Sequence, residues 1–162
     1  MKNKVVFVLF IIVVLIAIYL LYLKNSNKKI TNISYFNYSY TVGYHYEASI
    51  VYKFIRHNNT YIIKIKDEGK TEEELREYEV NNEFALKLNK ILNNYNVYRW
   101  NGFRKYDKNV LDGNSFNLDV KFENGTIEAD GYMKWPKNYK MFKNDIDELF
   151  NSLRCDKNGK DV

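Results

Sequence analysis

The stretch from Trp100 to Gly113, WNGFRKYDKNVLDG, gathers residue types that bind metals or ligands. Asp107, Asn109 and Asp112 offer oxygen atoms close to a glycine, as the ligands of a calcium loop do. The spacing does not fit an EF-hand loop, because the glycine comes one residue late and Leu118 stands where the bidentate glutamate belongs. We therefore predict no metal here, and a calcium loop of another kind stays an alternative.

Two other interpretations of this stretch need no metal. In the first it is a turn, which Asp107 and Asp112 hold through side-chain to backbone hydrogen bonds while Trp100 and Phe103 anchor its ends in the core. In the second it is a lip that binds a peptide or a glycan. The turn accounts for more of the residues. The candidate binding residues are Trp100, Phe103, Arg104, Asp107 and Asp112.

Few residues have the arrangement that catalysis requires. His45 and His57 have no companion at the spacing of a metal site, and Cys155 follows the last apolar position of a predicted helix. No nucleophile elbow, zinc-protease motif or phosphate-binding glycine loop occurs. The remaining enzymatic option is a hydrolase that uses Asp119 and Asp130, which would face each other across a hairpin turning at residues 123–126. We predict no cofactor, and an enzyme is the less favoured class.

Aromatic and β-branched residues predict the strands that must position these side chains. Residues 34–55 predict two strands that turn near Val42-Gly43, and further strands are expected at Thr60–Asp67 and Tyr98–Trp100. Alternating apolar residues from 115 to 122, followed by Asn124-Gly125, predict a hairpin with a type I′ turn. An aromatic face that packs or binds is expected from Tyr38, Tyr40, Tyr44 and Tyr46.

Apolar spacing predicts two helices, the first at Asn82–Asn94 and capped by Asn81 or Asn82, the last capped by Asn138 with an apolar stripe from Tyr139 to Leu153. Residues 71–80 allow a helix start with a capping box or a strand at Leu75–Val80, and we favour the strand. Runs of strands separated by helices indicate an α+β domain at residues 33–154. Its antiparallel sheet would carry two main helices on one face. Residues 155–162 would form a flexible tail.

An apolar run, VVFVLFIIVVLIAIYLLYL, occupies residues 5–23. At about 1.5 Å per residue, a helix of this length reaches across the roughly 30 Å hydrocarbon core of a bilayer. The run is longer than a signal-peptide core and lacks a small-residue cleavage site. We therefore predict a transmembrane helix between a short tail at 1–4 and a linker at 24–32, with the lipid bilayer as its partner. The short N-terminal tail favours an extracytoplasmic C-terminal domain.

The charge distribution argues against a nucleic-acid partner. The formal net charge is +5, and the five lysines beside the apolar run account for all of it, so the rest of the chain is neutral. A neutral domain lacks the basic excess that phosphate binding requires. The single cysteine excludes an internal disulfide.

A series of short motifs runs through the second half of the chain. They are Trp100-x-Gly102-Phe103, Leu111-Asp112-Gly113, SFNLDVKFENG, Gly131-Tyr132 and Pro136-Lys137-Asn138-Tyr139. In these motifs, residues 97–150 resemble a domain of uncharacterised envelope and lipoprotein-like proteins of Firmicutes. The resemblance implies an envelope location and fold but no activity. This chain lacks the lipobox cysteine of the lipoprotein members.

Together these features predict a single-pass membrane protein of the cell envelope with a small extracytoplasmic domain. That domain would bind an envelope protein or a glycan without covalent chemistry. Two alternatives are an envelope-acting hydrolase that uses the hairpin carboxylates and a cytoplasmic-facing subunit of a membrane complex.

Overall fold

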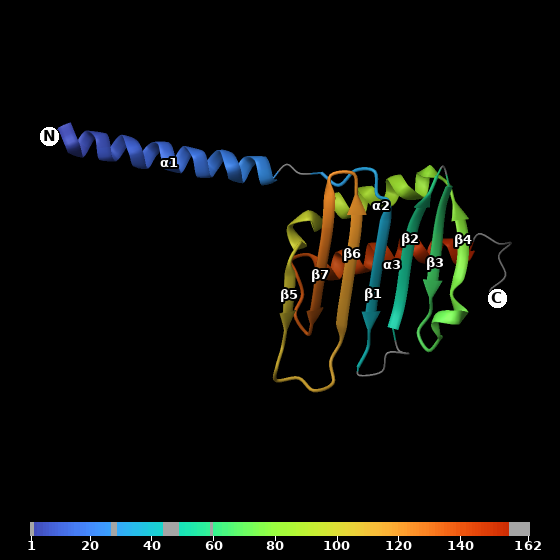
Figure 1. Cartoon of the computed structure of the whole chain (residues 1–162). Coiled ribbons are helices and arrows are strands. Elements are labelled where there is room, and N and C mark those ends of the chain that lie inside the picture. Colours follow the sequence, from blue (N-terminus) through green and yellow to red (C-terminus); the bar gives the residue numbers. More distant parts are fainter. Residues whose placement is uncertain (1, 27–28, 44–48, 59, 156–162) are drawn as a thin grey trace.

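Seven strands form one sheet in the order β4-β3-β2-β1-β6-β7-β5 (Figure 1). The computed structural model describes residues 2–26, 29–43, 49–58 and 60–155. The strands are β1 (Tyr35–Thr41), β2 (Ser49–His57), β3 (Thr60–Lys66), β4 (Arg76–Val80), β5 (Phe103–Tyr106), β6 (Ser115–Phe122) and β7 (Gly125–Tyr132). All neighbours are antiparallel except β5, which runs parallel to β7 at one edge. The predicted antiparallel sheet is therefore a mixed sheet.

The two domain helices, α2 (Asn82–Asn94) and α3 (Tyr139–Cys155), cover the same face of the sheet (Figure 1). A third helix, α1 (Lys2–Ser26), precedes the sheet, and two 3-10 helices, η2 (Glu72–Glu74) and η3 (Val97–Trp100), lie in the connections. The meander β1–β4 comes first, and the chain then crosses through α2 to the opposite edge before it forms the β6–β7 hairpin. This arrangement confirms the predicted α+β class.

Alternate residues of the strands point toward the helices and form the core. The buried ones on β1, β2, β3, β6 and β7 that join this core are Phe36, Tyr38, Tyr52, Phe54, Ile63, Ile65, Phe116, Leu118, Val120, Phe122, Ile127 and Ala129. The residues between them point to the opposite face, where Lys53, Asn37 and Asp119 are neighbours in register. The strands thus follow the alternation that a sheet with one covered face requires.

Helix α2 confirms its prediction at both ends. The Asn81 side-chain oxygen accepts hydrogen bonds from the backbone N–H groups of Glu83 (3.0 Å) and Phe84 (3.4 Å), as an N-cap does. Both interpretations of residues 71–80 hold in part. The backbone N–H of Thr71 donates to the Glu74 carboxylate at 3.0 Å in η2, and β4 follows directly.

The β6–β7 hairpin turns one residue earlier than the sequence predicts. Phe122 pairs with Gly125, so the loop residues are Glu123 and Asn124. Neither of them has the positive φ that a type I′ turn requires, so that turn prediction is wrong. The new register pairs Asp119 with Glu128 instead of Asp130.

The segment around Trp100 also differs from the prediction. Asn96 adopts a left-handed φ of 52° after α2, and residues 97–100 then form η3 instead of a short strand. Beyond it, the backbone N–H of Gly102 donates to the Glu128 carbonyl at 2.9 Å. That bond starts the pairing of β5 with β7 inside a stretch that was expected to be a turn.

The predicted transmembrane helix at residues 5–23 needs correction. In the part of the chain that the structure describes, no helix combines the length and the apolar character that a bilayer crossing requires. The fold is therefore an α+β domain preceded by a helix, without a described transmembrane span. The bilayer contact and the location inferred from the same run stay predictions.

The predicted linker at 24–32 is partly packed onto the domain. Helix α1 continues to Ser26, and Ile30 is only 1% exposed. The backbone N–H of Ile30 donates to the Asn93 side-chain oxygen at 3.0 Å, and its carbonyl accepts from the Asn93 amide at 2.8 Å. The core of the domain therefore begins at Ile30 rather than at residue 33.

Candidate binding groove

Trp100, the first of the predicted binding residues, lies in the core. It is 3% exposed, and its ring packs against Phe142 at 4.9 Å and Tyr139 at 6.1 Å between centroids. Both partners belong to α3, so Trp100 fastens the η3 turn under that helix. A side chain in this position stabilises the fold.

Phe103 and Arg104 point to opposite faces of the sheet because they are neighbours on β5. The Phe103 ring packs against Phe116 on the helix side, with centroids 6.2 Å apart. The Arg104 guanidinium lies on the other face, 3.0 Å from a Glu128 oxygen and 3.6 Å from an Asp130 oxygen. The structure therefore does not bring Trp100, Phe103 and Arg104 together into a lip.

Of the two aspartates of this stretch, Asp107 holds a turn as predicted. Asp107 forms an ion pair with Lys134 at 2.9 Å and accepts the backbone N–H of Asn109 at 3.1 Å. The Lys134 hydrogen bond, followed by that of Asn109, lowers the pKa of Asp107. Asp112 is exposed and lies beside Gly43, whereas the partners of Asp107 are Lys134 and Asn109. Among the described residues, no group of three metal-binding side chains forms, so the calcium alternative gains no support.

The hairpin carboxylates are not arranged as the hydrolase alternative requires. Asp130 lies opposite Asn117 in the sheet and near the guanidinium of Arg104, whereas Asp119 lies opposite Glu128. Burial raises the pKa of Asp119; Lys121 lowers it and Glu128 raises it further. The expected Asp119–Asp130 pair is therefore absent from the register.

The raised pKa of Asp119 predicts a pH-dependent stability change for Asp119→Asn. Because the pKa is raised on folding, the ionised carboxylate opposes folding at every pH above its folded-state pKa. Asp119→Asn should therefore increase the free energy of unfolding at neutral pH, and the gain should vanish below the ordinary pKa of 3.8. Urea denaturation at about pH 7 and about pH 3 measures this difference.

Asp130→Asn is the matched control, because it removes a carboxylate that lies near Arg104. No gain in stability is expected from it at either pH. An Asp119→Asn variant that is less stable than the original chain at neutral pH would contradict the prediction.

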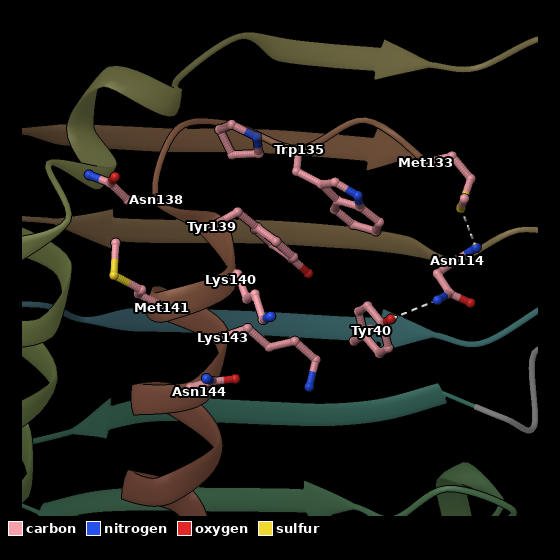
Figure 2. Close-up of a pocket in the computed structure, with 11 residues that line it drawn as sticks. Tyr40, Asn114, Met133, Trp135, Asn138, Tyr139, Lys140, Met141, Lys143 and Asn144 are labelled. Carbon is pink, nitrogen blue, oxygen red and sulfur yellow. Dashed lines mark hydrogen bonds between the residues drawn. The ribbon is translucent and has the colours of Figure 1, made fainter.

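A groove that the sequence did not indicate lies where α3 begins. It has a volume of about 730 Å³, within the range of small-ligand sites. Its lining residues are Tyr40, Asn114, Met133, Trp135, Pro136, Asn138, Tyr139, Lys140, Met141, Lys143 and Asn144. We call it the aromatic groove. The residues that line the aromatic groove come from β1, from the segment before β6, from the segment after β7 and from the first turns of α3 (Figure 2).

Trp135 forms the exposed aromatic surface of the aromatic groove. Its side chain is 36% exposed, and its ring stacks on Tyr139 with centroids 4.7 Å apart and planes 19° apart. Tyr40 lies 6.2 Å away on β1. Figure 2 shows the Trp135 and Tyr139 rings beside each other and Tyr40 facing them. Tyr139 is only 5% exposed and the Tyr40 ring is tilted by 34° from the indole, so Trp135 supplies most of the exposed ring surface.

The aromatic groove rests on the rigid core beneath it. The Tyr139 ring lies 4.6 Å from Phe116, and its hydroxyl is 2.8 Å from the hydroxyl of Tyr38. Burial is the main cause that raises the pKa of both tyrosines, so both hydroxyls stay protonated at neutral pH. One of them therefore donates to the other. This buried bond fixes the ring on which Trp135 stacks.

Amide and ammonium groups surround the three rings. Asn114 donates through its amide to the Tyr40 hydroxyl at 2.8 Å, and its backbone N–H contacts the Met133 sulfur at 3.2 Å. The Lys143 ammonium lies 4.6 Å from the centre of the Tyr40 ring and 2.5 Å from an Asp147 oxygen. Each side chain that positions Tyr40 is thus itself held by a second contact.

Other predicted features fall partly outside the described residues. Tyr44, Tyr46 and His45 lie outside them, so the predicted aromatic face is described only at Tyr38, which is buried, and at Tyr40, which lines the groove. His57 is exposed at the end of β2.

The sequence matches no known protein-family model and no curated protein.

Proposed function

We propose that the chain is a non-covalent binding protein whose α+β domain holds a saccharide ring in the aromatic groove. The observation that carries this proposal is the half-exposed indole of Trp135, stacked on Tyr139 above the buried Tyr38 hydroxyl. One side of a pyranose ring presents C–H groups, which pack on a flat aromatic face. The stacked Trp135 ring is already held in place, so few side chains need to become ordered when a ligand binds.

The edge of the aromatic groove suits the hydroxyl groups of a sugar. Asn138 and Asn144 line it, and a side-chain amide has both donors and an acceptor, whereas the Asn114 amide already bonds to Tyr40 and Gly43. Sugar hydroxyls also donate and accept, so they match amides better than an apolar peptide side chain would. The choice of a cell-envelope glycan draws on the resemblance predicted for residues 97–150, and that resemblance stays a prediction. The extracytoplasmic location and an envelope-protein partner stay predictions.

Trp135→Ala is expected to weaken saccharide binding at least about tenfold, because aromatic residues in a binding centre contribute the largest share of affinity. The full chain labelled with ¹⁵N has two indole N–H signals, from Trp100 and Trp135. Addition of a β-1,4-linked glucose trisaccharide or of methyl β-D-glucuronide should shift the Trp135 signal more than that of buried Trp100. The shift measured against sugar concentration gives the affinity of each chain that keeps Trp135, and isothermal titration calorimetry gives the affinity of Trp135→Ala on the same scale.

Tyr106→Ala is the matched control, because this aromatic side chain is also exposed (62%) and lies on β5, outside the groove. It should leave the affinity unchanged. The proposal fails if neither sugar shifts the Trp135 signal, or if Trp135→Ala and Tyr106→Ala bind equally well.

A further inference from the structure

The charged residues of the aromatic groove are all of one sign. Its lining includes Lys140 and Lys143 and no aspartate or glutamate. These lysines are three residues apart on α3, so their side chains share one face of the helix. The first turn of α3 carries no acidic residue either. A ligand seated on the rings would therefore meet positive charge from a single side.

The two lysines have different surroundings. Lys143 is paired with Asp147 and lies over the Tyr40 ring, so its charge is largely compensated and its position is fixed. Lys140 is exposed, and among the residues that the structure describes no carboxylate lies within ion-pair distance of it. The nearby Lys134 is already bound to Asp107. The uncompensated charge at the groove thus belongs to Lys140.

We propose that the aromatic groove selects saccharides that carry an anionic group, a carboxylate or a phosphate, and that Lys140 is the residue that recognises the charge. This inference rests on the proposed function, because the ring must stack on Trp135 for its substituent to reach Lys140. Figure 2 shows the Lys140 side chain extending from α3 beside the Tyr139 ring. Lys143 positions Tyr40 and contributes less to charge recognition.

The test compares two ligands that differ in one group, methyl β-D-glucuronide and methyl β-D-glucoside, on the full chain by the Trp135 indole signal. The glucuronide should bind about 2–5-fold more tightly, the range of an exposed ion pair. This preference should shrink when NaCl is raised from about 20 mM to about 500 mM, because salt screens exposed charges. Lys140→Gln should abolish it.

Lys137→Gln is the matched control, because Lys137 is also exposed but does not line the groove. It should keep the preference for the glucuronide. Equal affinities for the two glycosides, with Trp135 shifting in both titrations, would overturn the anionic inference while the saccharide proposal stands. If neither glycoside shifts Trp135, both proposals fail. If hexaglutamate shifts Trp135 and the glucuronide does not, the groove binds acidic peptides instead.

Discussion

Phe150→Ala is expected to lower the free energy of unfolding by about 3–5 kcal/mol, the cost of removing a large aromatic side chain from a core. Phe150 is 0% exposed and connects three elements to α3. Its ring stacks on Tyr52 at 4.6 Å and on Phe36 at 5.8 Å, and it meets Phe84 of α2 edge-on at 5.2 Å. Because no single neighbour can move to fill the cavity without losing its own contacts, the cost should lie in the full range. Urea denaturation measures it.

Two further variants make this result specific. Leu86→Ala changes a 59% exposed residue of α2 and should alter stability by less than about 0.5 kcal/mol. Phe150→Leu leaves a smaller cavity and should be more stable than Phe150→Ala, so it stays measurable if the alanine variant does not fold. A Phe150→Ala chain as stable as Leu86→Ala would show that α3 does not close the core as described.

Gly131→Ala is expected to cost about 3 kcal/mol and to disrupt the aromatic groove. A Cβ at Gly131 would overlap the carbonyl oxygen of Lys134 and lie 2.6 Å from Cε1 of Phe116. The backbone must therefore shift, and overpacking of this kind usually costs 1–3 kcal/mol. The shift falls on the turn through Met133, whose φ is 53°, and this turn leads into Trp135. Unfolding measures the stability, and acrylamide quenching measures the altered exposure of Trp135.

Thr126→Ala is the control on the same strand. Thr126 is exposed, so its replacement should change stability by less than about 0.5 kcal/mol and should leave quenching unchanged. If Gly131→Ala behaves like Thr126→Ala in both measurements, the close approach of Lys134 does not determine the position of Trp135.

Local signals explain which elements could be predicted. Helix α2 follows from apolar spacing and the Asn81 cap, and both act within a few residues of each other. The strands β6 and β7 follow from alternation. Strand β5 could not be predicted, because its four residues are fixed by pairing with Ala129–Tyr132, far along the chain. The hairpin register was missed because Asn-Gly favours a turn at residues 124–125, whereas the observed pairing of Phe122 with Gly125 leaves Glu123 and Asn124 in the loop.

The binding groove was missed because its parts are distant in sequence. Tyr40 pairs with Phe116, and Phe116 pairs with Gly131, so only the order β1-β6-β7 brings Tyr40 near Trp135. Residues 136–139 were interpreted as a motif at the start of a helix and not as part of a binding site. A tryptophan placed just before a proline, outside the alternating strand, was the available signal. Trp100 was predicted to bind instead, because its burial under α3 depends on tertiary packing that the sequence does not show.

The pairing of β1 with β6 at the centre of the sheet also affects how the chain folds during its synthesis. Tyr35 pairs with Lys121, so strand β1 acquires its second neighbour only after most of the domain has left the ribosome. Until then the nascent meander β1–β4 exposes a tyrosine-rich edge that can join other chains. Such distant pairing also slows folding. Slow synthesis at low temperature, or a holdase chaperone that covers this edge, should therefore raise the yield of folded protein.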